Sequence, residues 1–226
     1  MHYTYARPIY SFMSSDRNSP KKVGAARPAS AFQRMERMPP LLMMLYVGLV
    51  GITVLFAVLV GAYAFTHFRD GASSGVYALP RFFSLSTIVL LASSYVIAQA
   101  SRIYAQDDLA TLRRCLGATL LLSCIFAGLQ VLGWRELMAQ GIFFDGMASG
   151  TFVYLLSALH VAHLLGGMLF LLVLLLRTHY ASNDAVRALV FIRNPYRRLQ
   201  LRMVTLYWHF IDGLWIALFA AFLFLY

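Results

Sequence analysis

The chain divides near Pro40 into a polar segment without periodicity and a series of long apolar runs. Residues 1–40 mix Ser, Pro, Arg, Lys and Asn, which is typical of a segment that is disordered or ordered only against a partner. Each apolar run after it approaches or exceeds the roughly 20 residues that a helix needs to cross a bilayer. We predict membrane spans near 41–66, 81–101, 115–134, 148–176 and 203–226.

These runs predict an all-α membrane protein in which residues 41–226 form a five-helix transmembrane bundle. The sequence shows none of the strand alternation that a transmembrane barrel requires. Polar residues interrupt the second and third runs, but small hydroxyl side chains are common where membrane helices pack closely. A signal peptide is a poor interpretation of the start, because the run at 41–66 exceeds the 7–15 apolar residues of a signal core.

Composition and charge place the bundle in a membrane and orient it. Of the 226 residues, 60% are hydrophobic and 12% are charged, about half the usual share for a soluble domain. Sixteen of the 19 Lys and Arg residues fall in the first 40 residues and in the loops after the second and fourth spans. The positive-inside rule therefore predicts a cytoplasmic amino terminus, with Tyr226 on the periplasmic side. The same asymmetry explains the net charge of +10 as a topology signal, so we expect no nucleic-acid partner.

Four ionisable side chains lie inside the predicted spans, where each is costly and needs a reason. His160 and His163 belong to the fourth span, and His209 and Asp212 to the fifth. A spacing of three residues puts the members of each pair on one helix face.

Three interpretations of these side chains stay open. The histidines could ligate haem or a metal, although three histidines and one carboxylate without cysteine make a poor ligand set. Alternatively, His160, His209 and Asp212 form a structural polar cluster that sets the helix register. The third possibility is a polar face that binds a lipid headgroup or lines a water path.

Several segments resemble subunit III of the haem-copper oxygen reductases, the cytochrome c oxidase subunit III family. The most specific is Tyr207-Trp208-His209-Phe210-Ile211-Asp212 with Trp215, which is similar to that family's last helix. A second is His160-Val161-Ala162-His163-Leu164-Leu165-Gly166-Gly167. Weaker agreement comes from Phe126, Gln130, Trp134, Leu137 and Gly141, and from Leu79-Pro80 with Ser93-Ser94. The resemblance covers roughly residues 41–226 and matches the family's short form, which lacks the first two helices of the seven-helix form.

The resemblance implies an accessory subunit with no catalytic, cofactor or metal site of its own, since haem and copper belong to partner subunits. It implies packing on the catalytic subunit I, support of proton uptake and stability, and bound phospholipid. His163 and Arg177 match family positions that contact lipid phosphate, while Gln130, Trp134, Trp208 and Trp215 are expected to pack helices together.

The expected location is the bacterial inner membrane. A small membrane subunit or the chain's own tail is expected to cover the face left by the two missing helices. Two departures from the family pattern stand out, Gly51-Ile52-Thr53 and Gly133-Trp134, where the family often carries an acidic residue. Roles that rest on those carboxylates therefore do not carry over.

Other functions compete with a respiratory terminal oxidase subunit. One is a similar subunit of a nitric-oxide-reducing complex, which only the partner's identity would separate. Another is a membrane electron carrier with haem between the fourth and fifth spans. A third is a transporter using His160, His163 and Asp212 as a proton relay, against which the sequence shows no inverted repeat.

Overall fold

The computed structural model describes residues 39–69, 80–144 and 148–225, and it confirms the all-α class. No strand occurs within these ranges. The helices are α2 (Pro40–Arg69), α3 (Arg81–Ala98), α4 (Ala100–Ala105), α5 (Leu109–Ala139), α6 (Ala148–Ala181), α7 (Ala185–Arg193) and α8 (Pro195–Leu225). Predictions for the tail, the first loop and Tyr226 concern residues that lie largely or wholly outside the described ones.

Five helical segments are long and apolar enough to cross a membrane, as predicted. They are Pro40–Arg69, Arg81–Ala105, Leu109–Ala139, Gly150–Ala181 and Pro195–Leu225. Most of these helices extend beyond the predicted apolar runs. A helix of 30 residues is about 45 Å long, so its two ends reach the headgroup layers on both sides. The second span is divided by a turn at Gln99, which separates α3 from α4.

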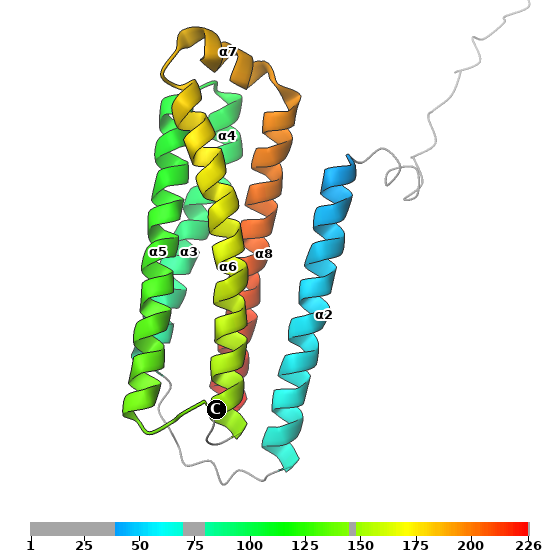
Figure 1. Ribbon diagram of the computed structural model, residues 1–226, viewed down its shortest axis with the longest axis vertical. Coiled ribbons are helices and arrows are strands. Elements are labelled where there is room, and N and C mark those ends of the chain that lie inside the picture. Colours follow the sequence, from blue (N-terminus) through cyan, green and yellow to red (C-terminus); the bar gives the residue numbers. More distant parts are fainter. Residues whose placement is uncertain (1–38, 70–79, 145–147, 226) are drawn as a thin grey trace, which may run out of the picture. The chain divides into compact units, whose positions relative to one another are not determined.

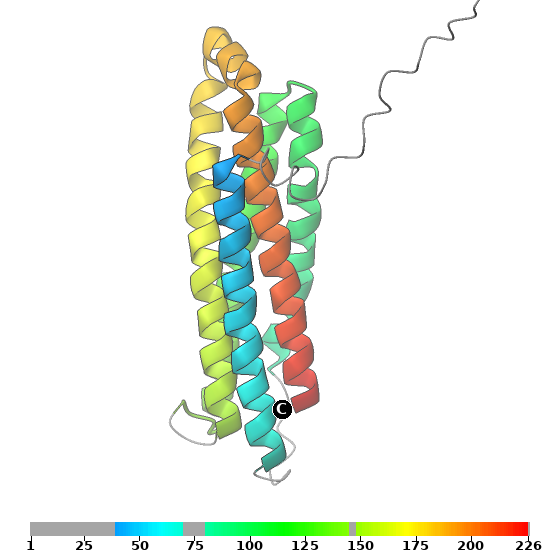
Figure 2. The same cartoon turned by 90° about the vertical axis from the view of Figure 1, so that its right-hand side faces the viewer.

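Residues 40–226 form one compact unit, in which α3, α5, α6 and α8 make a four-helix bundle. Neighbouring helices in this bundle run antiparallel, and α2 packs against α6 and α8 only on one side (Figures 1 and 2). We call the end that holds α7 the α7 end. The start of α2 and the α4–α5 turn lie at this same end (Figure 1).

Short side chains fix where several helices begin. The Asp108 carboxylate accepts a hydrogen bond of 3.0 Å from the Thr111 amide and so caps α5. Hydrogen bonding from the Thr111 side chain, and next from the Thr111 amide, holds the pKa of Asp108 below its ordinary value. Asp184 caps α7 in the same way, and the Asn194 side chain accepts a hydrogen bond at the start of α8. Pro195 suits the first position of α8 because no amide hydrogen is needed there.

Two glycines let helices approach closely inside the bundle. A Cβ atom added at Gly133 of α5 would overlap the Phe83 ring of α3. A Cβ atom at Gly167 of α6 would lie 2.7 Å from Cε1 of Tyr207 on α8. Small residues at helix contacts are a common way to pack membrane helices, because van der Waals contact replaces the hydrophobic driving force there.

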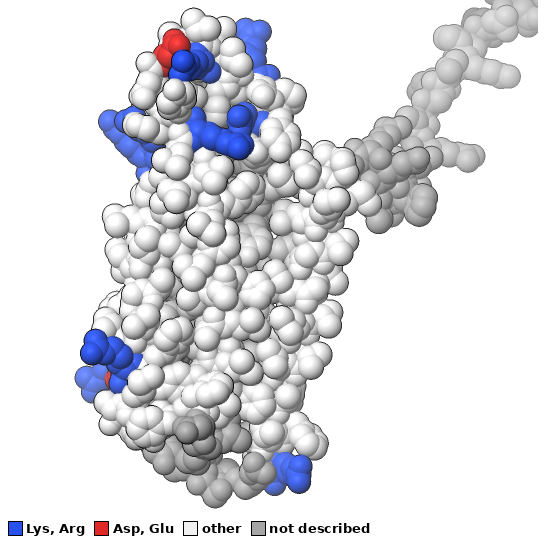
Figure 3. Space-filling view, viewed as in Figure 1, with Lys and Arg blue, Asp and Glu red and all other residues white. Residues whose placement is uncertain are grey.

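Charge is concentrated at the α7 end of the described unit (Figure 3). Three arginines lie toward the opposite end, namely Arg69, Arg81 and Arg135. Nine lie toward the α7 end: Arg102, Arg113, Arg114, Arg177, Arg187, Arg193, Arg197, Arg198 and Arg202.

Candidate functional site

The contact between α8 and α3 is held by a ladder of side-chain hydrogen bonds. The Trp208 indole N–H donates to Ser93 Oγ at 3.0 Å, and the Trp215 indole N–H donates to Thr87 Oγ1 at 3.0 Å. The third bond joins Nδ1 of His209 to the neighbouring Ser94 hydroxyl at 2.8 Å. Ring nitrogens on α8 thus meet hydroxyl groups on α3, which fixes both the spacing and the register of the two helices.

Helix α5 uses the same kind of hydrogen bond toward both of its neighbours. Gln130 Nε2 donates to Ser86 Oγ of α3, and the Trp134 indole N–H donates to Ser157 Oγ of α6, both at 2.9 Å. Ser86 and Ser157 in turn donate to carbonyl oxygens of their own helices, so each hydroxyl bridges two helices. These contacts show where the four predicted packing residues Gln130, Trp134, Trp208 and Trp215 lie.

His160 lies at the centre of the bundle among aromatic rings. Its ring centroid is 5.0 Å from that of Trp215 and 5.8 Å from that of Phe126, and the side chain is fully buried. Neither of its ring nitrogens has a hydrogen-bond partner among the described residues.

The predicted polar cluster is not a single hydrogen-bonded group. Asp212 is 3% exposed, and its carboxylate interacts with the Ser94 side chain, although within the described ranges neither carboxylate oxygen has a partner at good hydrogen-bond geometry. His209 is exposed and bonds to Ser94 instead. No hydrogen bond joins His160, His209 and Asp212 to one another in the described part of the chain.

His163 lies where α2 meets α6. Its ring contacts the Phe56 ring of α2 edge to face, with centroids 5.7 Å apart. Its Nδ1 hydrogen bonds to the Leu159 carbonyl at 2.7 Å, and its own carbonyl accepts a bond of 2.9 Å from the Tyr207 hydroxyl. His163 therefore connects α2, α6 and α8 close to the middle of the span.

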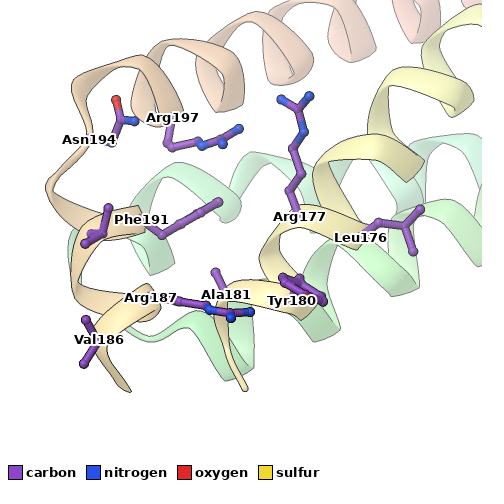
Figure 4. Close-up of a pocket in the computed structure, with 10 residues that line it drawn as sticks. Leu176, Arg177, Tyr180, Ala181, Val186, Arg187, Phe191, Asn194 and Arg197 are labelled. Carbon is purple, nitrogen blue, oxygen red and sulfur yellow. The ribbon is translucent and has the colours of Figure 1, made fainter. Parts of the chain in front are cut away.

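Arg177 lies in a different place, in a pocket of about 570 Å³ at the α7 end (Figure 4). The pocket is formed by the end of α6, by α7 and by the start of α8. Arg187 and Arg197 line it as well, each over an aromatic ring: Arg187 lies 4.9 Å from the Tyr180 centroid, and Arg197 lies 5.2 Å from the Phe191 centroid.

The structure does not bring the two predicted lipid contacts together. Fourteen residues of α6 separate His163 from Arg177, which corresponds to about 21 Å along the helix. One phosphate group cannot touch both side chains. Arg177 lies near the α7 end of α6, whereas His163 lies near the middle of the same helix.

The hydroxyl partners of the bundle were missed as site residues, although the sequence held a signal for them. Ser86, Thr87, Ser93 and Ser94 recur with a spacing of seven residues, which places them along one face of α3. In the described ranges, no three His, Cys, Asp or Glu side chains lie close enough together to hold a metal ion.

Fold and site together define a multi-pass helical membrane protein whose bundle is joined by hydrogen bonds between Trp, Gln or His side chains and hydroxyl groups. Comparison with known proteins agrees with this class. The family model "Cytochrome c oxidase subunit III" matches residues 75–226. The chain belongs to the cytochrome c oxidase subunit III family.

Individual relatives carry the same description. A Bacillus "Cytochrome c oxidase subunit 3" is 32% identical over 172 residues, which are 75% of this chain and 78% of the relative. The "Probable cytochrome c oxidase subunit 3" of Mycobacterium tuberculosis is 32% identical over 139 residues, 62% of this chain. That match spans 64% of the mycobacterial protein's length. A Rhizopus stolonifer relative is 30% identical over 60% of this chain and 43% of its own length.

Proposed function

We propose that the chain is the non-catalytic subunit III of a respiratory haem-copper terminal oxidase in a bacterial inner membrane. In this role it packs on the catalytic subunit I, which reduces oxygen and pumps protons, and it supports the stability and proton uptake of that partner. The observation that carries the proposal is family membership over residues 75–226. This range contains all four helices of the bundle and every hydrogen bond that joins them.

The orientation is part of the same proposal. The excess of arginine at the α7 end supports a cytoplasmic location for that end, since basic residues are retained on the cytoplasmic side. The end of α8 then faces the periplasm. Accessibility to a membrane-impermeant cysteine reagent tests this: a cysteine replacing Asn183 should react in inverted vesicles and stay protected in intact spheroplasts.

We further propose that the pocket at the α7 end holds an anionic phospholipid. Its three guanidinium groups can fork onto phosphate oxygens. Apolar lining residues such as Leu176 and Val190 suit the adjoining acyl chains. Native mass spectrometry of the complex should show one fewer bound phospholipid when Arg177 and Arg197 are both replaced by Gln. Replacing Arg135 by Gln at the opposite end is the control, and an unchanged lipid count in the double variant would contradict the site.

The role as an oxidase subunit is tested by copurification. A tagged full-length chain, isolated from its host in mild detergent, should bring down a haem-containing complex that consumes oxygen. The separated chain should show no Soret absorbance of its own. A chain that carries the haem absorbance by itself would support the electron-carrier alternative, and a complex that consumes nitric oxide rather than oxygen would support the nitric-oxide-reducing one.

A further inference from the structure

One strip of the membrane-facing surface carries an exposed histidine at mid-depth together with small and polar residues. It follows the groove between α3–α4 and α8, and we call it the seam surface. Its central members are small or polar residues: Ser94, Ala98, Ser101, Arg202, His209 and Gly213. The same two rows also hold the exposed Leu91 and Ile216. The two rows adjoin, because Ser94 hydrogen bonds to His209 and because Ser101 and Arg202 line the same pocket of about 540 Å³.

The outward faces of α5 and α2 carry many of the aliphatic side chains that a lipid-facing surface requires. On α5 the outward residues include Leu121, Ile125 and Leu132, which are 40% to 63% exposed, together with small residues such as Cys124 and Gly128. On α2 the outward residues include Val47, Val50, Val54 and Val58, which are 56% to 73% exposed. Acyl chains can solvate such rows, but they offer nothing to the polar groups of the seam surface.

His209 shows most clearly how the seam surface differs from the aliphatic outward faces. It lies fourteen residues from Pro195, about 21 Å along a helix of about 46 Å, and so near the middle of the membrane. The side chain is exposed, and only its Nδ1 is hydrogen bonded, to Ser94. Its Nε2 makes no hydrogen bond with any residue that the structure describes. A polar group in that position is costly in lipid and indicates a partner at that depth.

Open space at Gly213 and the positive charge of Arg202 lie on the same face of α8 as His209. No atom lies within 4 Å of a Cβ built on Gly213, one turn below His209, so the surface there is open and flat. Arg202 is two turns above His209, on the same side of α8 and at the α7 end. A helix lying in this groove would meet a flat glycine, a hydrogen-bonding group at mid-depth and a positive charge near the membrane surface.

We propose that the seam surface packs against a transmembrane helix of a partner subunit. That helix presents a hydrogen-bonding side chain to Nε2 of His209 and an acidic group near Arg202. The inference rests on the proposed function for the class of partner, the catalytic oxidase subunit. It adds which face of this chain makes the contact and what the partner's helix must carry.

Two matched glycines provide the first test. Gly213 and Gly128 both lie outward on long helices, and a Cβ meets nothing within 4 Å at either position. In the full chain expressed in its host, Gly213→Leu should reduce copurifying partner by about tenfold, because the added side chain occupies the contact. Gly128→Leu should retain the partner. Equal retention by the two variants, or loss with Gly128→Leu alone, would overturn the proposal.

A second set separates contact with a partner from a purely internal role. Ser94→Ala removes the internal hydrogen bond and leaves the outward nitrogen of His209 in place. His209→Leu removes both, while His209→Gln restores a group that can hydrogen bond outward. We expect Ser94→Ala and His209→Gln to keep most of the partner and His209→Leu to lose it. Equal losses in Ser94→Ala and His209→Leu would show that His209 acts only within this chain.

Photocrosslinking then identifies the occupant. Benzoylphenylalanine in place of Gly213 should crosslink to a membrane-spanning segment of the haem-bearing subunit, and the same probe in place of Gly128 should not. Crosslinks to lipid or to residues 1–38, with the haem complex still attached, would overturn the seam surface and leave the proposed function standing. A crosslink to a spanning helix of a complex without haem would support the surface and refute the oxidase assignment.

Discussion

The contact of α3 with α8 and the contact of α2 with the bundle are built from different chemistry. The first contains three hydrogen bonds in which Trp208, His209 and Trp215 meet hydroxyl groups. The second includes two ring pairs, Phe56 with His163 and Tyr63 with Phe152. In the most apolar stretch of α2, 11% of residues are buried, against 28% to 33% in the other four spans.

This difference teaches how each helix is fixed in place. Lipid is as apolar as a leucine side chain, so burying apolar surface gives little preference for one helix neighbour over another. Directional hydrogen bonds and close glycine contacts do give such a preference, and both occur within the four-helix bundle. We therefore expect the bundle to tolerate little change and α2 to tolerate much more. The following substitutions test that expectation, beginning with the largest effect.

Removal of the Trp215 ring from the centre of the bundle should cause the largest loss of stability. Trp215 contacts the rings of Phe83, Phe126 and His160, so Trp215→Ala leaves a large cavity between helices. We expect a loss of roughly 3 kcal/mol in unfolding free energy, measured by chemical or thermal unfolding in detergent. Phe65→Ala on α2, where the ring is 66% exposed, should change little. Similar losses at both positions would abolish the distinction between α2 and the bundle.

The next effect is expected where glycine lets α6 approach α8. Gly167→Ala would place its methyl group 2.7 Å from Tyr207, and overpacking of this kind costs about 1–3 kcal/mol. The neighbouring Gly166 has open space at its Cβ position, so Gly166→Ala is an adjacent control with the same change in helix propensity. Thermal unfolding of both variants in one detergent gives the comparison. A stable Gly167→Ala variant would mean that Tyr207 moves aside freely.

The class of fold could be predicted from the sequence because length and apolarity alone identify spans. Five apolar runs gave five spanning helices, although the helices also include charged residues that the runs excluded. The helix α7 was not predicted, since nine amphipathic residues between two spans produce no long apolar signal. Asp184, a capping side chain at its start, was the available clue.

The site was less predictable, for a physical reason. The donors Gln130, Trp134, Trp208 and Trp215 were recognised as packing residues, but their hydroxyl partners belong to other helices. Which donor meets which hydroxyl depends on helix register, and register depends on close contacts such as that of Gly133 with Phe83. Composition and periodicity carry no information about those pairings.

A hydrogen bond of the α3–α8 contact should give a smaller effect that is specific to the pair. Trp208→Phe keeps an aromatic ring and removes the N–H, while Ser93→Ala removes the acceptor. A double-mutant cycle should give a coupling energy of about 0.6 kcal/mol and at most about 1.7, the range seen for such bonds in membranes. The same cycle on Phe56 and His163, which share only a ring contact, tests whether α2 differs. A coupling near zero for Trp208 and Ser93 would mean that shape alone fixes this contact.

The smallest effect is expected at the water-exposed start of a bundle helix. The Asp108 carboxylate accepts the Thr111 amide hydrogen at the first turn of α5, and its pKa lies below the ordinary value of 3.8. A pKa that is lower in the folded chain means that the ionised cap stabilises the fold above about pH 4. That contribution disappears as the pH falls through the lowered pKa. Asp108→Ala should therefore lower the thermal midpoint slightly at pH 7, and the difference from the parent chain should shrink below pH 3.

Asn is the control for this position, because its side chain caps a helix without ionising. Asp108→Asn should keep most of the midpoint at pH 7 and show a weaker dependence on pH than the parent chain. The first turn of α2 holds no acidic residue, so the pH-dependent part of this effect belongs to α5. If Asp108→Ala and the parent chain kept the same difference from pH 7 to pH 3, the charge of the cap would be irrelevant. The start of α5 would then be held by packing alone.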